Sequence, residues 1–432
     1  MKTFLLFFFF ISLVLYGQIP IVWTPPGIVN NLTVGPGDKI ISYSNSYGTH
    51  LVINSNGTIR YILLSITGEL IMEQQIDDEC EYSYFITTAI TAYQDGLYII
   101  YQKGNYIKVV KSINGGETWN YLTQKNMGSS ICNGIDIAYD EKGLHVVWAV
   151  KMPNTDFEPH FETYYERYRR IEPAWVDFKK VTDEEIGSGG GQPTIALSDN
   201  RIHVNFNLLY YMSGSSVRDF DFISNEWLRT QHVEFNEPPP PVPGIQVTAF
   251  GSASERIVVL DGYLHVLSYV NVIANEAGYI YLYDKQKHID SDTWLPEILL
   301  TKWCFSAGLP AVISSDQKLH VLVNTSNYSL DYYEYSEGGY SSYIQVFDWA
   351  GLTMVSSYCL SAYSNSLYAY WIGFIDLNTK LYFSNTAQNP FSPVELNQRI
   401  DNYQSILLNR QNYFFNVSNI NEQNFIKARG KE

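Results

Sequence analysis

The chain has little positive charge, few cysteines and none of the common nucleotide-binding or hydrolase motifs. Lys and Arg number 28 against 44 Asp and Glu, a formal net charge of -16 at pH 7. Nucleic-acid binding relies on cationic side chains that neutralise phosphates, so this balance argues against a nucleic-acid partner. No G-x-S-x-G, P-loop, G-x-G-x-x-G or H-E-x-x-H motif is present. We therefore predict no cofactor.

The four cysteines are too few for a disulfide-dense small fold, and the absence of a C-x-x-C pair argues against a zinc site. We expect no metal. Two disulfides are predicted, Cys80 with Cys132 and Cys304 with Cys359, because each pair is separated by roughly one repeat unit of the pattern described below. Four buried free thiols are the alternative.

Long apolar runs are also missing. After residue 17 no segment reaches the 18 apolar residues typical of a membrane-spanning helix, so we predict no membrane span in the mature chain. The first 17 residues combine Lys2, an apolar stretch from Leu5 to Leu15, and the small residue Gly17 at a plausible cleavage point. This pattern is typical of a secretory signal peptide. We predict a signal peptide over 1–17, a single domain over 18–432, and a secreted or cell-surface protein.

The chain is rich in aromatic residues, at 15%, a composition that suits strands. One pattern recurs: a turn residue, then Leu or Ile, then His or Tyr, then a β-branched or aromatic run. Strong copies begin at Leu97, Leu144, Ile202, Leu264, Leu319 and Leu367, and weaker ones at Thr49 and Asn412. The spacing, about 45 to 62 residues, is that of a four-stranded propeller blade. We predict an all-β propeller with eight four-stranded blades, or seven if one weak copy is not a blade.

The two ends of the chain predict how the ring closes. Three strand-like runs near the C-terminus, Ser405 to Arg410, Tyr413 to Val417 and Phe425 to Ala428, lack a fourth. Ile19 to Trp23 supplies a strand-like run at the mature N-terminus. We therefore predict a ring closed by strands from both termini, which leaves only short protected edges.

Ser112 to Trp119 reads SINGGETW between two β-forming runs. Asn followed by two Gly predicts a tight hairpin, with Ser112 and Asn114 bonding the turn and Trp119 folding over it. The stretch resembles the Asp-box, or BNR repeat, of sialidase-like β-propellers. Ser112, Asn114, Gly116 and Trp119 take the motif positions, with Asn114 where the family usually has Asp. An ordinary Gly-Gly hairpin is the alternative. The resemblance implies a sialidase-like propeller fold.

Five of the eight histidines occupy one position of the repeat, namely His50, His145, His203, His265 and His320. Metal ligands must converge in space, whereas these residues are distributed around a ring. We expect them to be structural strand residues.

In a propeller with strands A to D from the centre outward, the A–B and C–D hairpins share one face. The B–C loops and the D–A connections share the other, and the long segments of this chain gather there. We predict a ligand site on that second face, near the central channel. Carboxylates suit glycoside chemistry and aromatic rings can stack on sugars. The candidate ligand-binding residues are Asp156, Glu158, Glu185, Arg256, Tyr210 and Tyr269.

No catalytic residue is predicted. Sialidase-like enzymes grip a carboxylate with three arginines, and their Arg-Ile-Pro motif is replaced here by Gln18-Ile19-Pro20. Only Arg256 is suitably placed. The first hypothesis is a secreted, non-catalytic binding module for a glycan or an extracellular protein ligand. An exo-acting glycoside hydrolase using loop-face carboxylates and a structural surface component are the alternatives. The oligomeric state is open, as is glycosylation at Asn31, Asn56, Asn324, Asn327 and Asn416.

Overall fold

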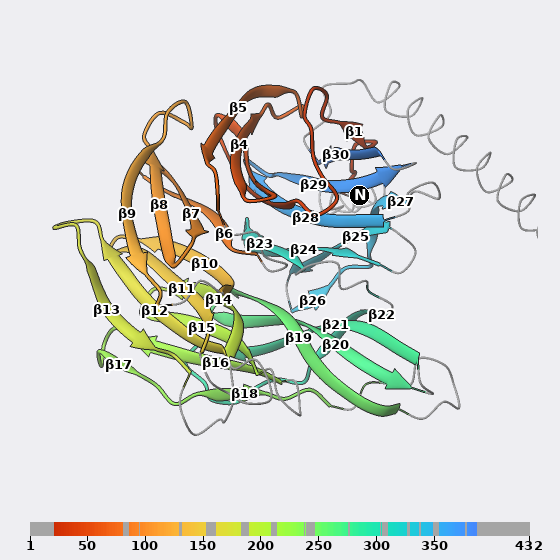
Figure 1. Ribbon diagram of the computed structural model, residues 1–432. Helices are drawn as coiled ribbons and strands as arrows, with labels where there is room; N and C mark the ends of the chain where they lie inside the picture. Colours follow the sequence, from red (N-terminus) through yellow and green to blue (C-terminus); the bar gives the residue numbers. More distant parts are fainter. Residues whose placement is uncertain are drawn as a thin grey trace, which may run out of the picture.

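The computed structural model describes residues 21–386, apart from 81–85, 95, 129–131, 153–160, 183–189, 209–213, 237, 239–246, 275–276, 303, 305–309, 326–328, 337, 349–353 and 376–377. The regular elements of these residues are all strands, β1 to β30. They form seven antiparallel sheets that follow one another around a ring (Figure 1). We number the sheets as blades 1 to 7, and the strands of each blade run from A at the centre to D at the rim.

The first four blades follow the chain in order. Blade 1 contains β2 (Lys39–Asn45), β3 (Gly48–Ser55), β4 (Thr58–Leu64) and β5 (Leu70–Asp77). Blade 2 contains β6 (Thr88–Tyr93), β7 (Gly96–Lys103), β8 (Tyr106–Ser112) and β9 (Asn120–Asn126). Blade 3 contains β10 (Cys132–Asp140), β11 (Gly143–Lys151), β12 (Phe161–Arg169) and β13 (Trp175–Lys180). Blade 4 contains β14 (Gly190–Ser198), β15 (Arg201–Leu208), β16 (Gly214–Asp221), β17 (Glu226–Trp227) and β18 (Gln231–Val233).

The last three blades complete the ring. Blade 5 contains β19 (Val247–Leu260), β20 (Tyr263–Ala274), β21 (Ala277–His288) and β22 (Ile298–Lys302). Blade 6 contains β23 (Ala311–Ser315), β24 (Lys318–Asn324), β25 (Ser329–Ser336), β26 (Gly339–Tyr340) and β27 (Ile344–Asp348). Blade 7 contains β28 (Met354–Tyr363), β29 (Ser366–Ile375), β30 (Asn378–Asn385) and β1 (Gly27–Ile28). In blades 4 and 6 the outer strand is split into two pieces, both paired with strand C.

The ring has seven blades, so the seven-blade alternative is correct and the preferred count of eight is wrong. Each innermost strand contacts the innermost strand of the next blade, and β28 of blade 7 contacts β2 of blade 1 directly. This contact leaves no gap for an eighth blade. The weak repeat at Asn412 and the three C-terminal runs, on which the eighth blade depended, lie outside the described residues.

The ring is closed by strands from both ends of the chain, as predicted, but with different residues. Strand β1 pairs with β30, Gly27 opposite Phe383 and Ile28 opposite Tyr382. The amide of Thr24 donates to the Asn385 carbonyl at 2.8 Å and extends this pairing. Ile21 to Trp23, the described part of the predicted strand, are not in a strand. Trp23 instead packs edge-on against Tyr332 of blade 6, with ring centroids 5.5 Å apart.

The core lies between blades. The second strand of each blade is buried on both faces, because each blade is covered by two neighbouring blades. Examples with at most 1% exposure are Leu51, Val52 and Ile53 of β3 and Val146, Val147 and Trp148 of β11. Burying one such side chain stabilises the fold by roughly 1.5–3 kcal/mol. Strand B therefore reads as a continuous apolar run, which is the repeat seen in the sequence.

Four of the five repeated histidines tie three strands of one blade together, and His265 ties two. Their Nδ1 atoms lie 2.7–2.9 Å from a side chain on strand C, which is Tyr61, Tyr165, Asp219, Asp284 or Tyr332. In four blades Nε2 bonds a residue at the end of strand A, which is Asn45, Asp140, Ser198 or Ser315. All five rings are buried. The prediction that this column is structural is confirmed.

The SINGGETW segment forms the turn between β8 and β9. The Gly116 amide donates to Ser112 Oγ at 2.9 Å, and the Thr118 amide donates to Asn114 Oδ1 at 3.0 Å. Gly115 and Gly116 have φ values of 69° and 94°, which glycine adopts without strain. Trp119 packs edge-on against Tyr61 of blade 1 at 5.0 Å. The turn therefore fastens two neighbouring blades.

The four cysteines are free and buried, so neither expected disulfide is present in the structure. Each lies in a different hydrophobic cluster between a different pair of blades, which separates the thiols of both expected pairs. Two of the glycosylation sequons, at Asn31 and Asn56, are exposed, Asn324 is buried, and Asn327 and Asn416 lie outside the described residues. No described helix is long and apolar enough to cross the membrane.

Candidate functional site

Two oppositely charged side chains from non-adjacent blades meet at the central channel. Asp136 lies on β10 of blade 3 and Arg256 on β19 of blade 5, so their pairing spans the innermost strand of blade 4. Arg256 Nη1 lies 3.6 Å from Asp136 Oδ2. Both side chains are partly accessible, at 23% and 21% exposed. The pair is therefore within reach of a ligand that enters the channel.

The Asp136 carboxylate is held in place by backbone amides on both of its oxygens. The Ile195 amide, from strand A of blade 4, donates to Oδ2 at 3.1 Å, and the Ile137 amide donates to Oδ1 at 3.0 Å. Burial disfavours the charged form and raises the pKa of Asp136, while the Arg256 charge and the two amides act in the opposite direction. Arg256 is thus bound to a fixed carboxylate, and at a distance longer than a hydrogen bond.

A pair of tyrosines lies beside the ion pair. The hydroxyls of Tyr269, on β20 of blade 5, and Tyr358, on β28 of blade 7, are 2.8 Å apart. Burial raises the pKa of both phenols, so both remain neutral at physiological pH. The Arg256 charge opposes this rise at Tyr358, which puts the guanidinium within electrostatic range of that ring. Arg256 of blade 5 thus pairs with Asp136 of blade 3 and acts electrostatically on Tyr358 of blade 7.

Four of the innermost strands, including those of Asp136 and Tyr358, carry uncharged polar atoms without partners. Among the described residues, side-chain oxygens of Thr88, Asn133, Thr194 and Ser356 are buried and have no hydrogen-bond partner in the protein. Thr194 directly precedes Ile195, and Ser356 lies two residues before Tyr358. A buried hydroxyl or amide oxygen without a partner is costly, so such sites normally take up ordered water or a ligand group.

Of the six predicted ligand-binding residues, the structure brings Arg256 and Tyr269 to this site. Tyr269 is 1% exposed, so its ring cannot stack on a sugar, and only its hydroxyl points to the cluster. Asp156, Glu158, Glu185 and Tyr210 lie outside the described residues.

Sequence reasoning missed Asp136 and Tyr358, because both sit in strands assigned a purely structural role. The available signal was an acid in the middle of the inner strand Ile135-Asp136-Ile137, where the repeat calls for apolar residues.

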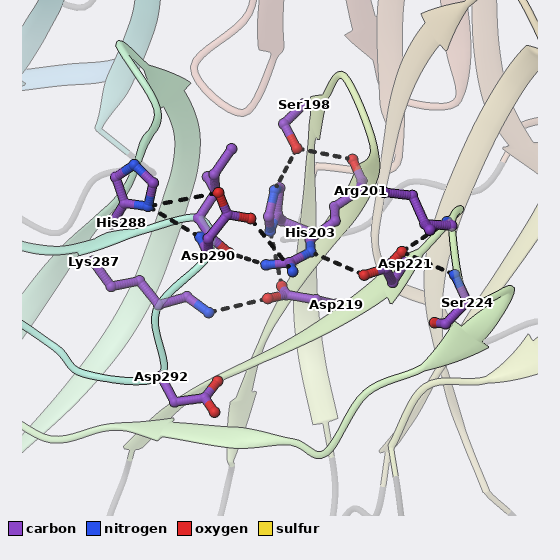
Figure 2. Close-up of polar contacts among 12 residues, drawn as sticks. Ser198, Arg201, His203, Asp219, Asp221, Ser224, Lys287, His288, Asp290 and Asp292 are labelled. Carbon is purple, nitrogen blue, oxygen red and sulfur yellow. Dashed lines mark hydrogen bonds and ion pairs between the residues drawn. The ribbon is translucent and has the colours of Figure 1, made fainter.

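A second polar cluster lies on the opposite face, formed by the A–B turn of blade 4 and the C–D turns of blades 4 and 5 (Figure 2). Ser198 Oγ is 3.0 Å from His203 Nε2, and His203 Nδ1 is 2.8 Å from Asp219 Oδ1. Lys287 Nζ lies 3.0 Å from Asp219 Oδ2. Burial raises the pKa of Asp219, but the hydrogen bond and charge of His203, together with Lys287, outweigh it and leave the pKa lowered.

The order Ser–His–Asp is that of a hydrolase triad, but the structure favours a structural role. His203 is 0% exposed, and the same arrangement recurs in blade 6, where Ser315 and His320 face the phenol of Tyr332 instead of a carboxylate. Because a tyrosine hydroxyl can take the place of the carboxylate in this repeated hydrogen-bond pattern, the pattern does not require the carboxylate that a catalytic triad needs for proton transfer. Among the described residues, no group of three His, Cys, Asp or Glu side chains could hold a metal ion.

Comparison with known proteins supports the fold alone. No family model and no curated protein sequence matches the chain. Among solved structures, the polysaccharide lyase Uly1 is similar with a TM-score of 0.52 at 10% identity, over 86% of this chain and 92% of that one. Trypanosoma rangeli sialidase in complex with the inhibitor DANA gives a TM-score of 0.45 at 10% identity, over 89% of this chain. AofleA from Arthrobotrys oligospora gives 0.42 at 10% identity, over 72% of this chain and 86% of that one.

The chain spans about three fifths of the length of the sialidase chain, 62%. At these identities the similarity supports the β-propeller fold and carries no residue roles.

Proposed function

We propose that the chain is a secreted β-propeller that binds a carbohydrate at the mouth of its central channel without cleaving it. The observation that carries the proposal is the Asp136–Arg256 pair, which is contributed by non-adjacent blades and is partly exposed. The resemblance of Ser112 to Trp119 to an Asp-box supports the sialidase-like character of the propeller.

The chemistry of the mouth suits sugar hydroxyls. Each oxygen of Asp136 accepts one backbone amide and keeps lone-pair capacity for a hydroxyl donor. Arg256 offers donors from a planar guanidinium that forms no close hydrogen bond to Asp136. These groups stand on inner strands of a closed ring, a rigid support of the kind that keeps a binding site in its geometry.

Binding is favoured over hydrolysis by the number of charged groups at the mouth. Glycoside hydrolysis uses two carboxyl groups about 5–10 Å apart. Among the described residues, Arg256 is paired with one carboxylate, that of Asp136. Binding a sialic acid carboxylate relies on several arginines whose guanidinium groups converge. In the described structure, Arg256 is the one arginine that pairs with Asp136 at the channel. The hydrolase alternative therefore depends on Asp156, Glu158 or Glu185 approaching Asp136.

A glycan array tests the proposal. The purified protein should bind a subset of glycans, and both Arg256→Gln and Asp136→Asn should weaken that binding by tenfold or more. Arg201→Gln is the matched control, because Arg201 is also paired with carboxylates, Asp221 and Asp290, but lies on the opposite face. Thermal melts confirm that each variant is folded. Binding that is equally insensitive to all three substitutions would refute the proposed site.

The same samples test catalysis. Chromatography of each bound glycan after prolonged incubation should show intact material. Released sugars would favour the hydrolase alternative and would direct attention to the loop carboxylates.

A further inference from the structure

We infer that the ligand of the channel mouth is a neutral saccharide, and that sugars carrying a carboxylate or sulfate are rejected there. This inference rests on the proposed function and specifies its ligand class. It follows from the charge balance of the Asp136–Arg256 pair, from how Asp136 is held, and from the uncharged character of other polar side chains on the same and neighbouring inner strands.

The positive charge of Arg256 is already balanced. Asp136 Oδ2 lies 3.6 Å from Nη1, so an anionic sugar that bound the guanidinium would place a second negative charge beside the first. The rest of the protein adds to this repulsion, because the chain carries a formal net charge of -16. Like charges brought together in a partly buried site strongly disfavour binding.

Asp136 is not free to move aside for an anion. Its two oxygens are each held by a backbone amide, from Ile137 on its own strand and from Ile195 on the neighbouring blade. Swinging the carboxylate away from Arg256 would break both bonds and leave buried amides without partners. A ligand therefore meets a fixed ion pair of zero net charge.

Uncharged polar side chains on the inner strands β10, β14 and β28 suit a neutral polyol. The oxygens of Asn133, Thr194 and Ser356 are buried and unpaired in the described structure, and none of these side chains carries a charge. A sugar hydroxyl donates one hydrogen bond and accepts others, so it can satisfy an amide oxygen or a carboxylate and take a guanidinium donor as well. Sugar hydroxyls can thus bind beside a paired carboxylate and guanidinium with no change in net charge.

The test uses hexoses and their matched uronic acids. Glucose and glucuronate, galactose and galacturonate, and mannose and mannuronate are each presented as neoglycoconjugates with the same linker, and binding is measured by surface plasmon resonance. In the wild-type protein, the neutral member of whichever pair binds should bind about tenfold tighter or more. Arg256→Gln should weaken the neutral member.

Asp136→Asn gives the sharper readout. It preserves the shape of the side chain and removes its negative charge, so the preference for the neutral member should shrink or reverse. A merely structural role for Asp136 would weaken both members equally. Asp221→Asn, which removes a carboxylate beside Arg201 on the opposite face, is the matched control and should leave the preference unchanged.

The failures of the two proposals are distinguishable. A wild-type protein that binds the uronate as tightly as the hexose or tighter, with binding lost in Arg256→Gln, would overturn the neutral-ligand inference and leave the proposed site standing. Equal weakening of both members by Asp136→Asn would also overturn the inference. Binding of no sugar, or binding indifferent to both Arg256→Gln and Asp136→Asn, would overturn the proposed function and the inference together.

Discussion

Acid should destabilise the propeller through its buried histidines, and His50 allows the size of the effect to be worked out. Its ring is 0% exposed. Burial lowers its pKa from 6.5 to about 4. The hydrogen bonds agree with a neutral ring: Asn45 Oδ1 accepts from Nε2–H, and Tyr61 O–H can donate to Nδ1.

The sign follows from linkage. Because the pKa in the folded state lies below that in the unfolded state, the unfolded chain takes up the proton first. The contribution of His50 is complete above pH 6.5 and is lost as the pH falls towards 4, at about 1.4 kcal/mol per pH unit. Between pH 6.5 and 5 this amounts to about 2 kcal/mol. Burial also lowers the pKa of His145 and His320, so their effects add in the same direction.

The assay is urea unfolding followed by tryptophan fluorescence at pH 7.5, 6.5, 5.5 and 4.5. His50→Phe should be less stable at neutral pH because it loses both hydrogen bonds, yet its stability should fall less steeply between pH 6.5 and 4.5. His50→Gln is the matched control: it keeps polar atoms near Tyr61 and Asn45, so it should lose less stability but show the same gentler slope. Identical slopes for the wild type and both variants would refute the reasoning.

Three further outcomes are expected. Lys287→Met should cost about 3–5 kcal/mol in urea unfolding, because it leaves the buried carboxylate of Asp219 without its ammonium partner; a loss below about 1 kcal/mol would count against the buried pair. Gly116→Ala should lower stability by about 1–3 kcal/mol, because the residue has a φ of 94° and a Cβ would overlap the Tyr61 hydroxyl; an unchanged melting temperature would contradict this close contact. Deleting residues 21–28 should expose the edge of β30 and lower the melting temperature by several degrees, and a deletion variant as stable as the full chain would show that closure by β1 is unimportant.

Much of the fold could be predicted from the sequence, because the second strand of every blade is buried in the same way and therefore has a similar sequence pattern. The six strong copies of the repeat all fall inside second strands, which are β7, β11, β15, β20, β24 and β29. The number of blades could not be predicted from the sequence. It depends on whether β28 and β2 pack against each other, and a contact between residues about 300 positions apart produces no periodic pattern in the sequence. The closing strand β1 is two residues long, too short for any alternation to show.

The candidate site was only half predictable for a related physical reason. Arg256 was predicted because it lies near the start of a predicted inner strand. The sequence shows Asp136 as an acid within an inner strand but not as the partner of Arg256, because the pairing joins blades 3 and 5 across blade 4, and no local pattern records which side chains meet over the channel. The disulfide prediction did not match the structure for the opposite reason. Spacing near one blade length suggested proximity, whereas each thiol is buried in its own inter-blade cluster.

The closure of the ring also fixes how the protein would be presented on a surface. Thr24 and Asn385 lie side by side, and the Asn385 side chain donates to the Ile66 carbonyl at 2.8 Å, in the C–D turn of blade 1. Both described ends of the chain therefore lie together on the hairpin face. Attachment to a surface at Thr24 or at Asn385 should therefore orient the propeller in the same way, with its loop face pointing outward, and the two attachments should be interchangeable.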